Sequence, residues 1–228
     1  MNILVLGKGK TGSLVAEIAA QRGHTVRALD IDDNPHASAL TAATLANVDA
    51  VIDFTAPEAA VENITAVLSA GSRIVVGTTG WYAHLDQLKA LALKTNGALL
   101  YGTNFSIGVQ KLFRLTAELA RIEGYTFSIN ETHHVTKLDA PSGTALTLKQ
   151  IIQSVQPGAE VKIEAHRIAD AKGEHIVKAA SDVDELEIRH NAFSRRGFAI
   201  GAVRAAEWLI EKGGKSGAWE FREIFDQL

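Results

Sequence analysis

The sequence predicts an α/β protein with a Rossmann-type parallel-sheet domain and a second, α+β domain with a mixed sheet. Up to about residue 105, short apolar runs alternate with amphipathic helical segments, and a glycine-rich turn follows the first run. Between residues 125 and 192 the pattern changes to stretches in which polar and apolar residues alternate. Strand–helix alternation with short links is typical of parallel strands joined by right-handed crossovers. Alternating stretches are typical of a sheet with one covered face.

The elements of the first domain follow from its apolar runs. Residues 2–6, NILVL, form a short continuous run rich in β-formers, which indicates a buried parallel strand. Pro57 and Gly71 begin and end one helical segment, in the positions that helices prefer. We expect further strands at residues 25–30, 48–55, 73–79 and 98–106, and helices at 11–23, 57–71 and 84–97.

The second domain is predicted to begin with a helix over residues 107–120. Alternating stretches then predict strands of an antiparallel or mixed sheet. These stretches lie at residues 125–135, 161–168, 174–181 and 184–192. Residues 197–212 return to a helical pattern.

Composition excludes several classes of function. The chain has 228 residues, a formal net charge of −3 and no cysteine. These values exclude disulfides, thiolate catalysis and cysteine-ligated zinc, and they give no basic face for nucleic acid. The first residues lack the features of a signal peptide, and no apolar run approaches membrane length. We therefore expect a cytoplasmic protein with neither nucleic acid nor membrane as a partner.

The turn LGKGKTG predicts a dinucleotide site. Gly7, Gly9 and Gly12 form a G-x-G-x-x-G pattern between the first strand and the first helix. Such glycines allow a tight turn and a close approach of the backbone to a pyrophosphate at the helix N-terminus. Asp30 ends the second strand, where an acid can accept hydrogen bonds from an adenosine ribose. The alternative is a turn whose glycines only permit positive φ.

The carboxylates near this turn bear on the choice between NADH and NADPH. Asp30, Asp32 and Asp33 would repel a ribose 2′-phosphate, which favours NADH. Lys8 and Lys10 could offset this repulsion, so use of both cofactors stays open.

A second polar segment follows the strand at 73–79. Gly77 allows close approach to the backbone, and Thr78 and Thr79 offer hydroxyls to a group such as a carboxamide. The alternative is a turn that caps the next helix.

The segment ETHHVTK, residues 131–137, concentrates titratable groups. In an extended strand His133 and His134 would face opposite sides, so we expect no shared metal ion and no metal site. His133 could exchange protons near neutral pH, and Lys137 could donate a proton or stabilise negative charge.

The helix that follows could form a cradle for a carboxylate. Its first turn combines Ser142 with the amides of Gly143 and Thr144 and the Thr144 hydroxyl. The alternative is that Ser142 only caps the helix and that the histidines are solvated.

The pattern E-x-H-H-x-x-K-x-D-A-P-S-G-T-A over residues 131–145 resembles the signature of the 4-hydroxy-tetrahydrodipicolinate reductase (dihydrodipicolinate reductase) family. The segments VIDFTAPEAA, GTTGW, NFSIGV and IRHNAFSRRGFAIGAVRAAEWL also resemble family segments, in the same order along nearly the whole chain. The glycine loop departs from the family pattern, because it is one residue shorter than usual.

This resemblance implies NAD(P)H-dependent reduction of 4-hydroxy-tetrahydrodipicolinate to tetrahydrodipicolinate in the diaminopimelate route to lysine. It implies a dinucleotide-binding domain at 1–105, completed by a C-terminal helix at about 199–228, and a substrate-binding and oligomerisation domain at 106–198. The family is usually tetrameric through its mixed sheets, so a homotetramer is expected, with a small dicarboxylate as substrate.

The resemblance also assigns roles to residues. His133 would be a proton donor or acceptor and Lys137 a proton donor, whereas His134, Gly143 and Thr144 would contact the substrate carboxylates. Residues expected to bind NADH or NADPH are Gly7, Lys8, Gly9, Lys10, Thr11, Gly12, Asp30, Gly77, Thr78, Thr79, Gly102, Thr103, Asn104 and Phe105.

Other functions fit the sequence less well. A dehydrogenase for amino-acid semialdehydes would usually require a cysteine nucleophile or a different arrangement of lysine and acid, and the chain has no cysteine. A dinucleotide-sensing regulator would be expected to carry a basic DNA-binding element. A purely structural protein would have no use for both the glycine loop and the histidine segment.

Overall fold

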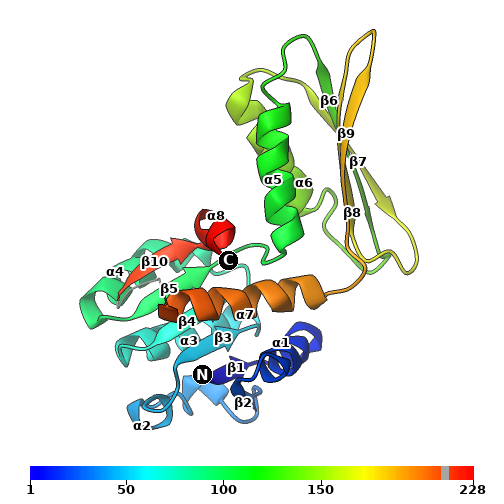
Figure 1. Cartoon of the computed structure of the whole chain (residues 1–228). Coiled ribbons are helices and arrows are strands. Elements are labelled where there is room, and N and C mark those ends of the chain that lie inside the picture. The colour runs from blue at the N-terminus through cyan, green and yellow to red at the C-terminus, as the bar shows by residue number, and fades with distance from the viewer. Residues whose placement is uncertain (212–215) are drawn as a thin grey trace. The chain divides into compact units, whose positions relative to one another are not determined.

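The computed structural model describes residues 1–211 and 216–228 (Figure 1). The chain divides into two compact units. Unit 1 comprises Met1–Ser106 and Arg196–Leu228, and unit 2 comprises Ile107–Arg195. Within the described ranges, no helix has both the length and the apolar character needed to cross a bilayer.

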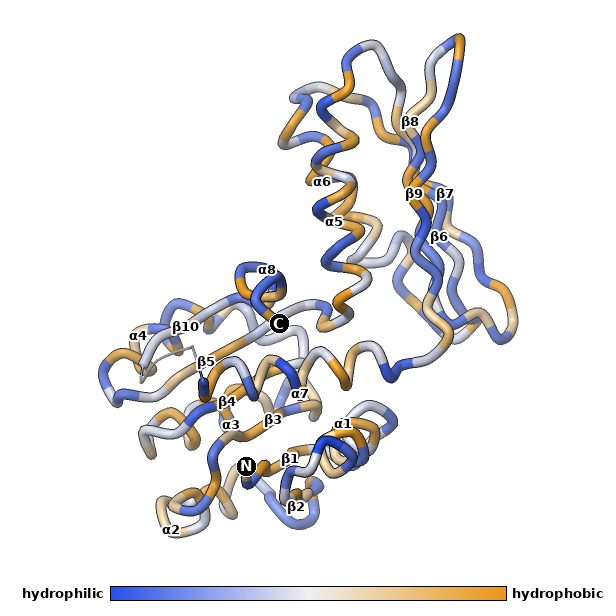
Figure 2. The backbone as a smooth tube through the Cα atoms, in the orientation of Figure 1, coloured by the Kyte–Doolittle hydropathy of each residue, from blue (hydrophilic) through white to orange (hydrophobic). Residues whose placement is uncertain are grey.

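Unit 1 contains a parallel sheet of six strands in the order β10-β5-β4-β3-β1-β2. Its strands are β1 (Asn2–Leu6), β2 (Thr25–Leu29), β3 (Ala50–Asp53), β4 (Arg73–Val76), β5 (Ala98–Tyr101) and β10 (Gly217–Glu220). The central strands are almost wholly apolar and buried, as the predominantly orange strands of Figure 2 illustrate. Burial on both faces explains why these strands read as continuous apolar runs.

The helices of unit 1 cover both faces of this sheet. They are α1 (Lys10–Gln21), α2 (Ala42–Leu45), α3 (Pro57–Ser69), α4 (Leu85–Thr95), α7 (Arg196–Glu211) and α8 (Phe221–Ile224), with 3₁₀ turns at Pro35–Ala37, Tyr82–His84 and Phe225–Gln227. Helices α3 and α4 pack on Leu4, Val51 and Ile74, which lie side by side in register. Since side chains alternate along a strand, Ile3, Ile52 and their neighbours face the other side, where α1 and α7 pack together.

The C-terminal segment differs from the expected single helix over about 199–228. Helix α7 ends at Glu211, residues 212–215 lie outside the described residues, and Gly217–Glu220 form β10 beside β5. The Trp219 ring packs edge-on against Trp208, with 5.8 Å between ring centroids. The sequence of β10, GAWE, contains a glycine and a glutamate and lacks the continuous apolar run that marks the other short strands of this sheet.

Unit 2 is a four-stranded mixed sheet in the order β7-β6-β8-β9, so the predicted fold class is confirmed for both units. Its elements are α5 (Ile107–Leu119), β6 (Thr126–His133), α6 (Gly143–Val155), β7 (Val161–Arg167), β8 (Glu174–Ala180) and β9 (Glu185–Asn191). Strand β6 pairs in parallel with β7 and antiparallel with β8. Phe127, Ile129 and Val177 form a core with residues of α5 and α6, and the opposite face of the sheet is more polar.

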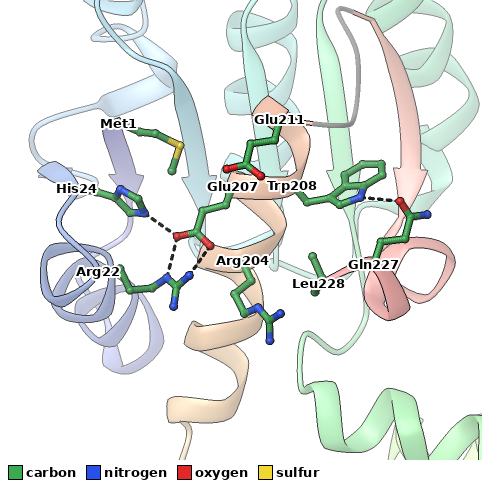
Figure 3. A pocket seen from close by; sticks show the side chains of 9 residues that line it. All are labelled: Met1, Arg22, His24, Arg204, Glu207, Trp208, Glu211, Gln227 and Leu228. Atoms are coloured by element: carbon green, nitrogen blue, oxygen red, sulfur yellow. Dashed lines mark hydrogen bonds and ion pairs between the residues drawn. The ribbon is translucent and has the colours of Figure 1, made fainter.

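Ion pairs stabilise the amino-terminal edge of the unit 1 sheet, around the pocket drawn in Figure 3. Glu207 on α7 accepts two hydrogen bonds from Arg22, both at 2.7 Å, and its carboxylate lies 2.8 Å from His24 Nε2. Trp208 Nε1 donates to Gln227 Oε1 at 3.0 Å. These contacts hold α7 against the end of α1 and the start of β2, and none of the residues expected in a functional site lines this pocket.

Two glycines of the turn after β1 are required by close packing. Gly7 has φ +93°, and a Cβ there would lie 2.3 Å from Phe54 O. A Cβ on Gly12, in the first turns of α1, would lie 2.0 Å from Gly7 O. Gly9 differs, because no atom lies within 4 Å of a Cβ built on it. Gly7 and Gly12 are thus needed for the fold, whereas the fold leaves open space at Gly9.

We expect Gly12→Ala to lower the free energy of unfolding by about 1–3 kcal/mol, because the added methyl group must displace backbone. Gly9→Ala is the matched control and should change it by less than about 0.5 kcal/mol. Urea unfolding followed by circular dichroism measures both variants. Equal unfolding midpoints for the two would contradict this packing argument.

Candidate active site

The residues expected to bind the cofactor lie at the carboxyl edge of the six-stranded sheet. The glycine turn follows β1, Asp30 follows β2, and the segments 77–79 and 102–105 follow β4 and β5. The carboxyl ends of parallel strands lie along one edge, which is where open α/β sheets bind ligands. The fold therefore brings four separate segments of the sequence to one edge of unit 1.

The glycine turn has the features of a pyrophosphate cradle. Gly9 is the N-cap of α1, and no side chain caps this helix end. The first amides of an α-helix have no acceptor within the helix and can bind an anion. Since the space beside Gly9 is open, a phosphate can approach this backbone closely. The turn thus fits a dinucleotide.

Lys8 is engaged by one of the carboxylates that follow β2. Its Nζ lies 2.6 Å from Asp33 Oδ2, and the same oxygen accepts a hydrogen bond from Asp30 N–H at 3.1 Å. The hydrogen bond with Asp33 raises the pKa of Lys8 and lowers that of Asp33. The ion pair is exposed and therefore screened by salt. It nonetheless directs the Lys8 charge toward Asp33.

The Thr78 hydroxyl is already bonded within the protein. Thr78 is buried; its Oγ1 donates to Asp53 Oδ1 at 2.6 Å and accepts from Thr55 N–H at 2.8 Å. Its carbonyl oxygen accepts a hydrogen bond from Trp81 Nε1 at 2.8 Å. The hydroxyl that the sequence suggested for a carboxamide is thus used inside the fold, while Thr79 beside it is exposed.

The segment after β5 is partly internal. Phe105 is 2% exposed, and its ring centroid lies 4.6 Å from that of Phe221. Asn104 Oδ1 accepts a hydrogen bond from Ser106 N–H at 2.8 Å, and Thr103 is exposed. A cofactor at this edge would meet Thr103 and backbone atoms more readily than the Phe105 ring.

In unit 2, a buried carboxylate lies beside the histidine segment. Glu131 on β6 is 0% exposed, and its two oxygens lie 3.0 and 3.1 Å from the Ser142 N–H nitrogen. The Arg167 guanidinium lies 3.3 Å from Oε1, and His175 Nε2 lies 3.7 Å from Oε2. Burial raises the pKa of Glu131, but the close approach of His175 and the hydrogen bonds from Ser142 outweigh burial and lower that pKa to about 2.

His133 lies on the same face of β6 as Glu131. Its Nδ1 is 3.5 Å from Glu131 Oε2, and the residue is 8% exposed. Burial lowers the pKa of His133 to about 4; the neighbouring His175 adds to this effect and the Glu131 carboxylate opposes it. The imidazole is therefore neutral at neutral pH. His134 lies just beyond the end of β6, and its Nδ1 is 2.7 Å from Thr136 Oγ1.

Lys137 lies in the loop that follows. Its Nζ is 2.8 and 2.9 Å from the two carboxylate oxygens of Asp139. Arg167 donates from Nε to the Lys137 carbonyl oxygen at 3.1 Å and from its terminal nitrogen to the Asp139 carbonyl oxygen. Because Arg167 is also paired with Glu131, it connects this loop to the buried carboxylate.

Ser142 is the N-cap of α6. It is 2% exposed, and its Oγ accepts a hydrogen bond from Ala145 N–H at 3.2 Å and lies 3.2 Å from His175 Nε2. Ser142 therefore caps the helix, which was the alternative to its direct part in a carboxylate cradle. Gly143 is exposed and Thr144 half-buried in the first turn of the same helix, where backbone amides point outward.

Glu131, His133 and His175 could together hold a metal ion, because one ligand atom of each lies within 4.8 Å of the others. The sequence argument against a metal considered only neighbouring histidines, and this cluster combines residues from β6 and β8. Its electrostatics disfavour a cation, since Arg167 and the Ser142 N–H already neutralise the Glu131 carboxylate. We interpret the cluster as an internal ion-pair network.

Three residues of this network were not singled out from the sequence: Glu131, Arg167 and His175. Strand register brings these residues together: Glu131 lies opposite His175 on β8, and His133 lies opposite Arg167 on β7. The period-2 spacing of Glu131 and His133 could have shown that both face one side. The partners on β7 and β8 depend on a register that no local pattern encodes.

Comparison with known proteins places both units in one family. The family description "Dihydrodipicolinate reductase, N-terminus" matches residues 1–105, and "Dihydrodipicolinate reductase, C-terminus" matches residues 108–225. A curated protein of Christiangramia forsetii named 4-hydroxy-tetrahydrodipicolinate reductase is 38% identical, covering 100% of this chain and 99% of its own length. A protein of the same name from Natronomonas pharaonis is 36% identical, covering 98% and 99%.

A solved structure supports the fold independently. Dipicolinate-bound dihydrodipicolinate reductase from Paenisporosarcina sp. TG-14 superposes with a TM-score of 0.80 at 22% identity, covering 98% of this chain and 99% of that one. The family descriptions together span nearly the whole chain, and the relatives are similar along their full length. The chain therefore belongs to the dihydrodipicolinate reductase family.

Proposed function

We propose that this chain is an NAD(P)H-dependent oxidoreductase that reduces 4-hydroxy-tetrahydrodipicolinate to tetrahydrodipicolinate in the diaminopimelate route to lysine. The observation that carries the proposal is full-length membership of the family, with relatives of that name at 36–38% identity. The glycine turn at the carboxyl edge of unit 1 supports binding of a nicotinamide dinucleotide. When bound in reduced form, that cofactor supplies the hydride.

The first turn of α6 and His134 are proposed to bind the carboxylates of the substrate. The Gly143 amide lies at the helix N-terminus, where backbone N–H groups and the helix dipole favour an anion. Thr144 adds a second amide and a hydroxyl. Because the Ser142 side chain is buried and caps the helix, its contribution would be to position these amides and not to contact the substrate.

Lys137 is proposed as the proton donor, with His133 as a neutral hydrogen-bonding partner that can accept a proton. A neutral imidazole at physiological pH has no second proton to donate without first being charged. The Lys137 ammonium carries one, and Asp139 holds it in place. Arg167 then holds the backbone of this loop relative to Glu131.

The test of the proposal is an assay with purified protein and freshly generated 4-hydroxy-tetrahydrodipicolinate, following oxidation of NADH and NADPH in parallel. We expect substrate-dependent oxidation of at least one cofactor. Absence of turnover with both cofactors, in protein that binds them, would overturn the proposed activity.

In this assay we expect Lys137→Ala and His133→Ala to lower kcat at least about 100-fold, the usual range for loss of a proton-transfer group. The Kd for the cofactor should change less than about threefold. Lys162→Ala is a matched control. Like Lys137, Lys162 lies in unit 2 and forms an ion pair with the carboxylate two residues after it in the sequence, that of Glu164. Unchanged turnover in both active-site variants would reject these roles.

The preference for NADH is a separate proposal. Asp30, Asp32 and Asp33 place negative charge where a 2′-phosphate would lie, and Asp33 engages the nearest lysine, Lys8. NADPH would therefore meet repulsion that Lys8 does not fully offset.

We expect Asp33→Asn to lower the KM for NADPH about fivefold relative to that for NADH, because it removes a charge and releases Lys8. Asp32→Asn makes the same change in charge without breaking the ion pair and should have a smaller effect. Steady-state kinetics with both cofactors compare the variants. If the ratio of the KM for NADPH to the KM for NADH is the same in the wild type and in Asp33→Asn, the proposed role of the Lys8–Asp33 ion pair is contradicted.

The oligomeric state and the location are also proposals. We propose a cytoplasmic homotetramer formed through the open face of the four-stranded sheet, as the family resemblance implies. In this chain that face carries Ser128, Asn130, Thr132 and Ile176, which alternate with the buried residues of β6 and β8. Sedimentation equilibrium should give the mass of four chains of 24.4 kDa, and a monomer mass at all concentrations would contradict the proposal.

A further inference from the structure

A second buried carboxylate lies at the carboxyl end of β3, in unit 1. Asp53 is 0% exposed and receives hydrogen bonds on both oxygens. Oδ1 accepts from Thr55 N–H (3.0 Å), Thr55 Oγ1 (2.8 Å) and Thr78 Oγ1 (2.6 Å), and Oδ2 accepts from Asn63 Nδ2 (2.8 Å). Every one of these groups points a hydrogen at Asp53. Burial raises the pKa of Asp53, and the hydrogen bonds that Thr78, Thr55 and Asn63 donate to its oxygens oppose this rise.

A chain of side-chain amides runs from this carboxylate to the loop after β2. Because Asn63 donates from Nδ2 to Asp53, its Oδ1 faces away and accepts from Asn34 Nδ2 at 3.0 Å. Asn34 Oδ1 in turn accepts from Ala39 N–H at 3.0 Å. Both asparagines are buried, with exposed fractions of 2% and 7%. A carboxylate can only accept, so Asp53 fixes which way each amide points.

The far end of the chain lies in the loop that bears the ribose-binding acid. Asn34 N–H donates to Asp30 O (3.0 Å) and Ile31 O (3.3 Å), so Asn34 closes a turn around residues 30–34. The same turn carries Asp33, which engages Lys8 of the glycine turn. At the near end, Asp53 Oδ1 accepts from Thr78 Oγ1 at 2.6 Å, in the segment that follows β4. One buried carboxylate is thus connected to both the loop after β2 and the segment after β4.

We propose that Asp53 is a positioning residue for the dinucleotide: through Asn63 and Asn34 it fixes the loop that binds the adenosine ribose, and through Thr78 the segment beside the nicotinamide. The proposal rests on dinucleotide binding by unit 1. Asp53 itself is buried below these segments and acts through them.

Asparagine cannot replace Asp53, although it has the same shape. Its amide nitrogen would face either Asn63 Nδ2 or the Thr55 N–H, and neither of these donors can turn into an acceptor, so two donors would oppose each other. Rotating the Asn63 amide moves the conflict to Asn34, and rotating Asn34 moves it to Ala39 N–H. In each arrangement one pair of donors remains opposed, and it can be moved as far as Asn34 in the loop after β2.

Exchanging the two residues should remove the mismatch. In the variant Asp53→Asn/Asn63→Asp, the new amide at 53 keeps its oxygen toward Thr55 and Thr78 and donates its N–H to the new carboxylate at 63. That carboxylate also accepts from Asn34 Nδ2, so every hydrogen bond of the chain is restored and the net charge is unchanged. A residue that acts only by bulk or by charge would show no such rescue.

The experiment measures the Kd of NADH and NADPH for the full-length protein by fluorescence titration, together with hydrogen exchange at the Ala39 amide. Asp53→Asn should raise both Kd values about tenfold and speed exchange at Ala39, as expected for loss of a hydrogen bond to a charged group. The double variant Asp53→Asn/Asn63→Asp should return the Kd values to within about threefold of wild type. Asp49→Asn, at the exposed other end of β3, is the control and should bind like wild type.

If Asp53→Asn folds and binds both cofactors with wild-type affinity, the proposal is overturned. It is also overturned if the double variant Asp53→Asn/Asn63→Asp binds the cofactors as weakly as Asp53→Asn does. If Asp53→Asn does not fold, Asn34→Ala tests the same chain away from Asp53, and wild-type affinity there would overturn it. Failure of the wild type to bind either cofactor would instead reject dinucleotide binding. In that case Ala39 exchange still shows whether Asp53 holds the loop.

Discussion

A buried carboxylate must be surrounded by hydrogen-bond donors, and each unit of this chain is organised around one such group. In unit 1, Asp53 gathers Thr55, Thr78 and Asn63 at the carboxyl edge of the sheet. In unit 2, Glu131 gathers backbone and side-chain donors from three elements. An unpaired buried charge is very costly, so neither constellation can rearrange one partner at a time. Loops that would otherwise be mobile are thereby given fixed positions.

The sequence was sufficient for the architecture, because that depends on patterns spread over many residues. Continuous apolar runs marked the parallel strands, and period-2 alternation marked β6 to β9. Strand β10 was missed, because its sequence GAWE is not a continuous apolar run. The glycine turn could be recognised because the fold requires glycine at fixed spacing, through the positive φ of Gly7 and the 2.0 Å approach at Gly12.

The site could be predicted only in part, because sequence shows which residues are near a loop but not which way their side chains face. Thr78 and Ser142 were both expected to present hydroxyls to a ligand, and both hydroxyls are hydrogen-bonded inside the protein. Arg167 and His175 were not foreseen, because they reach Glu131 through strand register. The assigned roles of His133 and Lys137 stay predictions, although both now have identified partners.

The two hydroxyls explain how a short segment can combine a rigid scaffold with an exposed binding surface. A threonine or serine that bonds inward leaves its neighbours to face outward: Thr79 is exposed beside buried Thr78, and Gly143 beside buried Ser142. The inward bond in each case is tied to a carboxylate network, directly for Thr78 and through the Ser142 N–H for α6. Backbone amides held in this way present donors at low entropic cost, which suits recognition of phosphate, carboxamide or carboxylate. The two buried carboxylates, Asp53 and Glu131, thus hold in place the segments that are proposed to bind the ligands.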